Sequence, residues 1–162
     1  MTRPAALFAA LTVAALAFAG CGGTATFVST EPPPDTSADA WYASRMAKVR
    51  TALTRAMTEA GFSLEPASSK TVVTGTKQQL PYVDEETGGP AGGPLPAYKM
   101  HAVLTRKEKT HVRLAVHPEC AACDGATPYE WEYPVDLLRD VLERTRRILG
   151  ETRPRFAYPR RY

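Results

Sequence analysis

Apolar residues recur at steps of three and four between residues 38 and 60, which is the spacing of one face of a helix. The members of this stripe are Tyr42, Met46, Val49, Leu53, Ala56, Met57 and Ala60. Thr36 and Asp39 stand ahead of the stripe at capping-box spacing, and Gly61 follows it as a residue suited to the C′ position. The pattern therefore predicts a helix over residues 38–60.

A second apolar stripe lies near the C-terminus, between Pro134 and Gly150. It is made of Val135, Leu138, Val141, Leu142, Thr145, Ile148 and Leu149. Proline suits the first position of a helix, and glycine suits the position after its end. Asp136 lies in the first turn and basic residues lie in the last, which is the favourable sense for the helix dipole. The pattern predicts a second helix over residues 134–149.

Between these helices the pattern changes to the period of two that is typical of strands. Four strands are predicted, over residues 62–65, 70–79, 98–106 and 109–117. A two-residue turn at Lys107-Glu108 would place one set of side chains from the last two strands on the core face: His101, Val103, Thr105, Thr110, Val112, Leu114 and Val116. The opposite face of this hairpin, called the wetter face below, should be more exposed to solvent.

Strands that lie between two helices favour an antiparallel sheet with both helices on one face. The predicted fold is an α+β two-layer sandwich of about four strands, in the order α-β-β-β-β-α, over residues 37–150. Residues 21–36 are small, polar and proline-rich, so they are predicted to form a tether. Residues 80–97 form a loop rich in glycine and proline, of a length that is usually functional or disordered. Residues 151–162 form an Arg/aromatic tail without regular periodicity.

The N-terminal residues indicate the compartment. Residues 1–20 carry one basic residue and then an uncharged apolar run that is too short to span a bilayer comfortably, which is the layout of a secretory signal peptide. Phe18-Ala19-Gly20-Cys21 resembles the lipobox of bacterial lipoproteins, which implies cleavage before Cys21 and its acylation with chains such as palmitate. Gly22, in place of aspartate, implies the outer membrane facing the periplasm if the organism is Gram-negative. The alternative is an ordinary signal peptide with a coincidental cysteine.

Charge limits the classes of partner. The chain has a formal net charge of +3, and residues 21–150 are close to neutral, so the positive excess of the mature protein lies in its tail. A basic surface for nucleic acid is therefore not predicted. Candidate contacts of the tail with anionic lipid headgroups, anionic envelope polymers or a protein groove are Arg153, Arg155, Tyr158, Arg160 and Arg161. A frayed, solvated terminus is the alternative.

The stretch His117-Pro-Glu-Cys-Ala-Ala-Cys123 admits three chemistries. In an oxidising compartment, with Cys21 acylated, Cys120 and Cys123 are the only thiols left, which favours a disulfide between them. The zinc alternative uses His117, Cys120 and Cys123 with a fourth ligand such as His111, but it lacks a second paired motif. The redox alternative needs a cysteine at a helix N-terminus, and a loop follows instead.

Motifs for catalysis are lacking in the sequence. No serine has a G-x-S-x-G context, and no glycine-rich phosphate loop follows a strand. His101 is expected to be a hydrogen-bonded, half-buried histidine. The sequence therefore predicts that the protein is not an enzyme and uses no cofactor.

Trp41, Val49, Leu53, Gly61 and Phe62 form a pattern of amphipathic packing that begins with tryptophan and ends with Gly-Phe. Together with the lipobox and a sheet that ends in a helix, this pattern resembles the helix-grip domain of lipoprotein component C of the outer-membrane β-barrel assembly machinery. The resemblance covers residues 39–150 and implies the fold alone.

These observations predict a non-enzymatic cell-envelope lipoprotein that presents an α+β binding module to protein partners or envelope polymers. The alternative is a thiol- or metal-binding periplasmic protein that uses His117, Cys120 and Cys123. The predicted contact surfaces are the loop of residues 80–97, the wetter sheet face and the Arg/aromatic tail.

Overall fold

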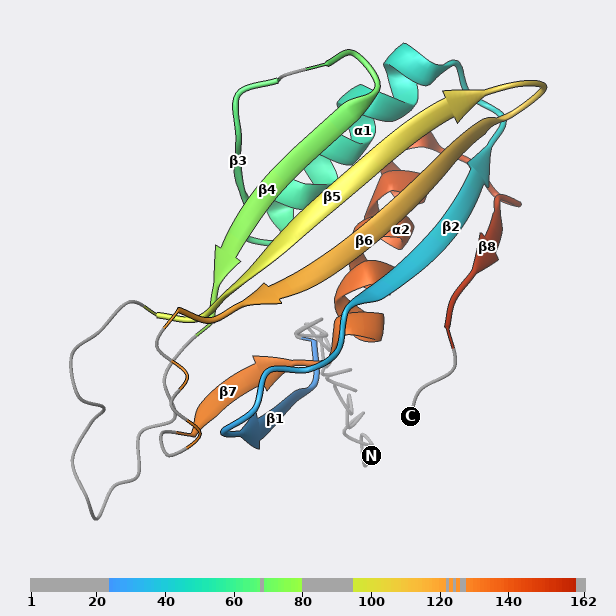
Figure 1. The fold of residues 1–162 in the computed structure, drawn as a ribbon. Coiled ribbons are helices and arrows are strands. Elements are labelled where there is room, and N and C mark those ends of the chain that lie inside the picture. Colours follow the sequence, from blue (N-terminus) through green and yellow to red (C-terminus); the bar gives the residue numbers. More distant parts are fainter. Residues whose placement is uncertain are drawn as a thin grey trace, which may run out of the picture.

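The computed structural model describes residues 24–67, 69–79, 95–121, 123, 125 and 128–159. The elements in chain order are β1 (Thr26–Ser29), β2 (Thr36–Tyr42), α1 (Met46–Glu59), β3 (Ser63–Leu64), β4 (Val72–Gln78), β5 (Ala97–Arg106), β6 (Thr110–Glu119), β7 (Tyr129–Glu132), α2 (Pro134–Leu149) and β8 (Arg155–Ala157). Both helices lie on one face of a six-stranded antiparallel sheet, while β1 and β7 pair with each other in what we call the β1–β7 ribbon (Figure 1).

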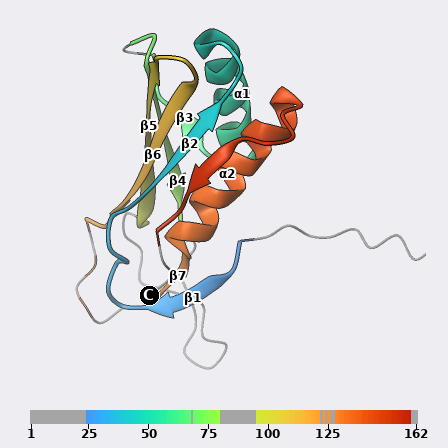
Figure 2. The same ribbon diagram turned by 90° about the vertical axis from the view of Figure 1, so that its right-hand side faces the viewer.

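The strand order of the large sheet is β3-β4-β5-β6-β2-β8. The predicted α+β class, the two helices and the antiparallel pairing are confirmed for the described residues. The predicted number of about four strands is wrong, because β2 and β8 extend the sheet to six. Seen at a right angle to the first view, the sheet forms one layer and the two helices form the other (Figure 2).

Residues 36–42 form a strand, which corrects the prediction that a helix begins at residue 38. This strand, β2, pairs with β6 along its whole length, and its buried residues alternate: Ala38, Ala40 and Tyr42. Helix α1 begins only at Met46. The capping box predicted at Thr36 and Asp39 is therefore wrong.

The stripe that predicted one long helix belongs to two elements joined by a turn. Tyr42 fits both patterns, because it stands four residues before Met46 and also alternates with Ala38 and Ala40. Pairing decides between them: β6 pairs with all seven residues of β2 and β8 pairs with residues 39–41, and these strands supply partners for its backbone groups. The buried Tyr42 hydroxyl then donates to the carbonyl oxygen of Leu142 at 2.9 Å, which ties the strand to α2.

The predicted ends of both helices are confirmed where glycine determines them. Gly61, just after α1, has a φ of +90°, and Gly150, just after α2, has a φ of +70°. Glycine takes a positive φ without the clash that a Cβ would cause, which makes it the common residue at this position. Helix α2 spans the predicted residues 134–149.

Strands β5 and β6 form the predicted hairpin in a register that differs by one residue. Arg106 pairs with Thr110, so the turn has three residues instead of two. A turn of odd length reverses the facing of β5, and the core side chains of the hairpin are Met100, Ala102, Leu104, Val112, Leu114 and Val116. The predicted facing of β6 is confirmed and that of β5 is wrong: His101, Val103 and Thr105 lie on the other face.

Two segments that were predicted to lack regular structure contain short strands. Strand β1 lies within residues 21–36 and pairs with β7, while β8 lies within residues 151–162 and pairs with residues 39–41 of β2. Each strand packs an aromatic residue inwards: Phe27 stands opposite the buried Trp131, and the Phe156 ring meets the edge of the Tyr42 ring at 6.2 Å. Four and three residues are too few for alternation to be recognised in a sequence.

The turn between β2 and α1 is held by side chains from distant parts of the chain. The carboxylate of Glu151 accepts hydrogen bonds from the backbone N–H groups of Ala43 and Ser44, at 3.0 and 2.8 Å. The Thr110 hydroxyl and the Arg106 guanidinium both donate to the carbonyl oxygen of Ser44, at 2.6 and 3.0 Å. This turn therefore fixes where the strand ends and the helix begins.

The pKa of Glu151 lies below its usual value. Partial burial acts to raise it, and the N–H groups of Ala43 and Ser44, with the nearby charge of Lys48, lower it by more in total. We expect Glu151→Gln to lower the free energy of unfolding by about 1 kcal/mol at pH 7, because amide-to-carboxylate hydrogen bonds at a partly exposed site are lost. Urea denaturation measures the difference.

The pH dependence of that difference has a definite sign. Because the folded-state pKa of Glu151 is the lower one, its contribution is present above the unfolded-state pKa and is lost as the pH falls through the folded-state pKa. The wild type and Glu151→Gln should therefore converge in acid. The matched control is Glu143→Gln, which removes an ion pair with Arg146 whose side chains are each about one-third exposed, and it should cost less. Equal losses in both variants, or a loss at Glu151 that persists in acid, would contradict this account.

Candidate functional site

One face of the six-stranded sheet is covered by α1 and α2, and no described helix covers the other, which we call the open face (Figure 2). All three histidines of the chain belong to it: His101 from β5, and His111 and His117 from β6. His101 is half-buried, with its Nδ1 3.3 Å from the Thr74 hydroxyl. The exposed Arg113 stands opposite Asp39 of β2. The open face is thus polar and basic along its middle strands.

Trp41 lies at the centre of the most elaborate contact on the open face. Strand β2 lies between β6 and β8, so His111 and Arg155 are the cross-strand neighbours of Trp41 on either side. The His111 and Trp41 rings stack with centroids 4.9 Å apart and planes inclined by 20°. The Arg155 guanidinium carbon lies 5.0 Å from the centroid of the Trp41 ring, within the range of a cation–π interaction.

His111 also connects two polar side chains. Its Nε2 lies 2.7 Å from Oδ1 of Asp39, and its Nδ1 lies 3.4 Å from the Thr105 hydroxyl. An ionised carboxylate only accepts hydrogen bonds, so Nε2 carries a proton and donates it to Asp39. The His111 and Asp39 side chains are each about one-third exposed, so the pair is open to a ligand while its orientation is fixed.

These five residues, Asp39, Trp41, Thr105, His111 and Arg155, are referred to below as the Trp41 cluster. The cluster borders a concavity of about 440 Å³ that is also lined by the three residues of the β5–β6 turn, Lys107, Glu108 and Lys109. The concavity combines an aromatic ring, a histidine and two lysines, with one carboxylate. Its chemistry suits acidic groups, with the partly exposed Trp41 side chain as an apolar contact.

The chain Asp39–His111–Thr105 has the order of a catalytic triad, but its geometry suits binding better. The Thr105 hydroxyl is exposed, and its 3.4 Å separation from Nδ1 is at the long limit of a hydrogen bond. Nucleophilic catalysis also depends on donors preorganised in a site that excludes water. An open sheet face does not exclude water.

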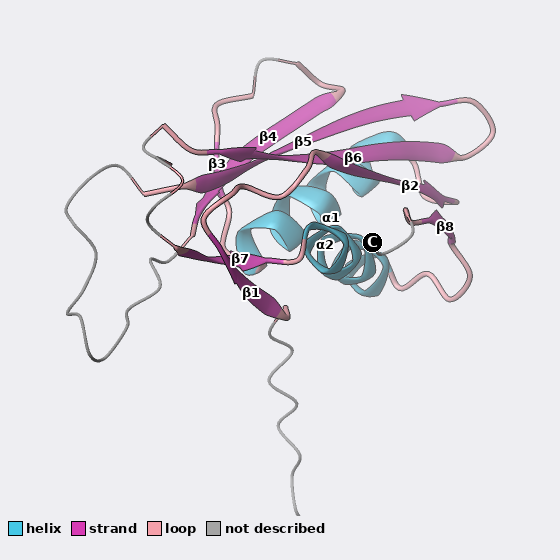
Figure 3. Ribbon diagram, turned by 60° about the horizontal axis from the view of Figure 1, so that its bottom comes forward, coloured by secondary structure: helices cyan, strands magenta, loops and turns pink. Residues whose placement is uncertain are grey.

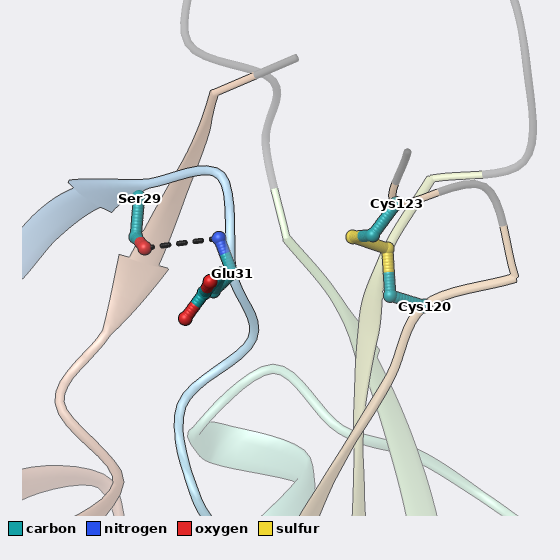
Figure 4. The surroundings of a disulfide bond; sticks show 4 residues. All are labelled: Ser29, Glu31, Cys120 and Cys123. Carbon is teal, nitrogen blue, oxygen red and sulfur yellow. Dashed lines mark hydrogen bonds between the residues drawn. A yellow bond between two sulfur atoms is a disulfide. The ribbon is translucent and has the colours of Figure 1, made fainter. Parts of the chain in front are cut away.

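Cys120 and Cys123 are joined by a disulfide with Cα atoms 5.5 Å apart, at the end of β6 (Figure 4). Both residues are partly buried and pack against the core. In the same view lies the turn after β1, where the N–H of Glu31 donates to the Ser29 hydroxyl at 3.1 Å. In the oxidised state, neither sulfur is a thiolate that could bind zinc or attack a disulfide.

His117 does not join the two cysteines in a ligand set. Its Nδ1 lies 2.9 Å from Oδ2 of Asp35, and both side chains are well exposed. Among the residues that the structure describes, no group of three or more His, Cys, Asp and Glu side chains could hold a metal ion. His111, considered as a fourth zinc ligand, is engaged with Asp39 instead.

The described tail residues that we predicted as binding candidates have different surroundings. Arg155 belongs to the Trp41 cluster, and Arg153 is exposed. Tyr158 packs back on the domain: its ring stacks on Phe156 at 5.6 Å and lies 5.2 Å from the guanidinium carbon of Arg139. Burial, with the charge of nearby Glu143, raises the pKa of Tyr158 to about 12. Cys21, Arg160, Arg161 and residues 80–94 lie outside the described part of the chain.

Sequence reasoning missed the Trp41 cluster because it assigned Asp39 and Trp41 to a helix. The available signal was the alternation of Ala38, Ala40 and Tyr42, which places the residues between them on one face of a strand. The only signal for Arg155 was that it stands next to Phe156, an alternation of polar and apolar residues that is too short to predict a strand by itself.

No family model matches this chain, and no curated protein sequence matches it. None of the helices in the described residues is long and apolar enough to cross a bilayer.

The disulfide generates a prediction about stability and metal binding. A bridge across so short a loop removes little entropy from the unfolded chain, so the double variant Cys120→Ser/Cys123→Ser should lose no more than about 2 kcal/mol of unfolding free energy. The oxidised wild type should bind no zinc, as measured by calorimetry, and its two cysteines should react with iodoacetamide only after reduction.

The matched control is His117→Ala with its cysteines intact, which should equal the wild type in both assays. Cysteines that react with iodoacetamide without reduction, or only after a chelator is added, would favour the metal or thiol alternative.

Proposed function

We propose that the protein is a non-enzymatic lipoprotein of the cell envelope, anchored through acylated Cys21, that presents its α+β domain as a binding module. In a Gram-negative organism the module would stand in the periplasm on the outer membrane. The observation that carries the binding role is the open sheet face with the Trp41 cluster, where aromatic, basic and hydrogen-bonding groups surround one concavity.

The arrangement of the Trp41 cluster supports recognition of a partner. The Trp41 ring is held between its cross-strand neighbours His111 and Arg155, so it has little side-chain entropy left to lose on binding. Tryptophan and arginine are the residue types that most often dominate binding energy at interfaces. Lys107, Lys109 and Arg113 add positive charge nearby. A protein segment that combines acidic and aromatic residues, or an anionic envelope polymer, fits this chemistry.

The second candidate is the thiol- or metal-binding protein that would use His117, Cys120 and Cys123. The sequence pattern that suggested it is real, but the disulfide and the His117–Asp35 contact favour a structural role for these residues. This candidate therefore applies only to a reduced form of the protein.

The lipid anchor is tested by the intact mass of the protein purified from its own membranes. We expect a chain that begins at Cys21 and carries the added mass of two or three acyl chains. Cys21→Ser should be neither acylated nor retained in the membrane fraction. An unmodified Cys21 in the mature protein would contradict the proposal at its first step.

The binding role is tested by site-specific photo-crosslinking in intact cells. A photoreactive amino acid at Arg113, on the open face, should give a discrete covalent adduct, and Trp41→Ala in the same chain should reduce its yield roughly tenfold. The matched control is the same photoreactive residue at Arg147, an exposed position on α2. Adducts of equal yield from both positions, or an adduct insensitive to Trp41→Ala, would contradict the assignment of the open face.

A further inference from the structure

Large apolar side chains that are exposed in the described residues gather at one end of the domain. They are Val28 in β1, Tyr133 directly after β7, and Leu95 two residues before β5, with exposed fractions of 49%, 41% and 39%. In Figure 1 the β1–β7 ribbon and the start of β5 lie at the lower end, and the β5–β6 turn lies at the upper end. Exposed apolar residues that cluster in this way mark a contact surface.

The β1–β7 ribbon is fixed to the sheet, so its exposed residues have a defined direction. Glu132 forms an ion pair with Lys77 of β4 at 2.8 Å, and its carbonyl oxygen accepts a hydrogen bond from the Tyr98 hydroxyl at 2.7 Å. The Gln79 side chain accepts from the Glu132 N–H at 3.2 Å, and Thr24 donates to the Glu132 carboxylate. Viewed from this end, the β1–β7 ribbon lies beside the N-terminal end of α2 (Figure 3).

An apolar groove opens at the same end, next to the β1–β7 ribbon. It has a volume of about 610 Å³, and its apolar lining includes Phe27, Pro33, Pro34, Tyr133, Val135 and Pro159. The Phe27 and Tyr133 rings lie 4.8 Å apart in its wall. Tyrosine at the edge of an apolar patch is typical of surfaces that meet the headgroup region of a bilayer.

Chain length connects this end of the domain to the lipid anchor. Thr24 is three residues after Cys21, and β1 begins two residues later. A fully extended chain spans at most about 3.5 Å per residue, so Thr24 lies within about 10 Å of an acylated Cys21. The part of the predicted tether that precedes β1 is therefore short, and it cannot hold the domain far from the membrane.

The exposed charged residues near this end include the acidic Glu31 and Asp35. Electrostatic attraction to anionic lipid therefore contributes little to the free energy of membrane contact. Burial of apolar surface contributes more. At about 25 cal/mol per Å², even partial burial of the exposed Val28 side chain favours contact once the anchor has brought this end of the domain to the surface.

We propose that the end of the domain formed by the β1–β7 ribbon rests on the lipid bilayer, with Val28 at the level of the lipid headgroups or below. This inference rests on the proposed lipid anchor at Cys21. It also fixes the orientation of the molecule: β5 runs away from the membrane and β6 returns towards it, and the Trp41 cluster, beside the turn that joins them, faces the aqueous compartment about 30 Å further out.

The test uses the full acylated protein in vesicles of phosphatidylethanolamine and phosphatidylglycerol, with nitroxide labels introduced at Val28→Cys or Lys107→Cys. Oxygen concentrates in bilayers and a neutral nickel chelate stays in water, so the ratio of their collision rates with the label reports its depth. We expect this ratio to be several-fold higher at residue 28 than at residue 107, which is exposed in the β5–β6 turn. Flotation of the vesicles reports the anchor independently.

The outcomes separate the two proposals. If the protein floats with the vesicles and the label at residue 28 is as water-exposed as that at residue 107, the orientation is overturned and the lipid anchor stands. If the label at residue 28 is shielded from both reagents, another protein surface covers this end, and the orientation is again overturned. If an intact mass shows no acylation and the protein does not float, the anchor fails and the orientation fails with it.

Discussion

Strand β2 lies between β6 and β8, and its pairing with β6 determines what each side of the sheet contains. The even-numbered residues Ala38, Ala40 and Tyr42 of β2 lie in the core, and the odd-numbered residues Asp39 and Trp41 lie on the open face. A shift of one residue in this register would place Trp41 in the core and Tyr42 in water. The Tyr42–Leu142 hydrogen bond and the contacts of Glu151 at the following turn oppose that shift, because both would be lost.

The same pairing gives the domain two different ends. At one end, Trp41 meets His111 beside the β5–β6 turn, where Lys107 and Lys109 line a concavity. At the other, β2 continues back into residues 33–35 and the β1–β7 ribbon, where apolar residues are exposed and β1 begins five residues after Cys21 in the sequence. Aromatic and basic groups in the first case suit a partner from the aqueous phase, and apolar side chains in the second suit a bilayer. The proposed function and the proposed orientation therefore follow from one arrangement of strands.

Much of the fold could be predicted from the sequence, where local signals were long and unambiguous. Helix α2 has sixteen residues between a proline and a glycine, and its boundaries were predicted correctly. The β5–β6 hairpin was also predicted, but the facing of β5 was inferred from an assumed two-residue turn, although Met100, Ala102 and Leu104 alternate along the strand as its apolar face. No local rule gives a three-residue turn at Lys107–Lys109, because it contains neither glycine nor asparagine.

The candidate site could not be predicted, because it is made by tertiary pairing. Asp39 and Trp41 reach His111 and Arg155 only when residues 36–42 form a strand, and the helical stripe beginning at Tyr42 concealed that strand. Arg155 was recognised as a binding candidate for its charge, without any means of seeing its cross-strand neighbour. Disulfide chemistry, in contrast, was accessible from the sequence, since two cysteines three residues apart need little tertiary information.

The measurement that tests the central claim most directly is the pattern of nuclear Overhauser effects from residues 36–45 of the folded protein. Pairing of β2 with β6 predicts cross-strand contacts between Trp41 and His111 and between Ala40 and Val112, with strong sequential Hα–HN contacts along residues 36–42. A helix that began at residue 38 would instead give sequential HN–HN contacts and Hα–HN contacts three residues apart, continuous with α1. That second pattern would remove the Trp41 cluster and, with it, the proposed binding face.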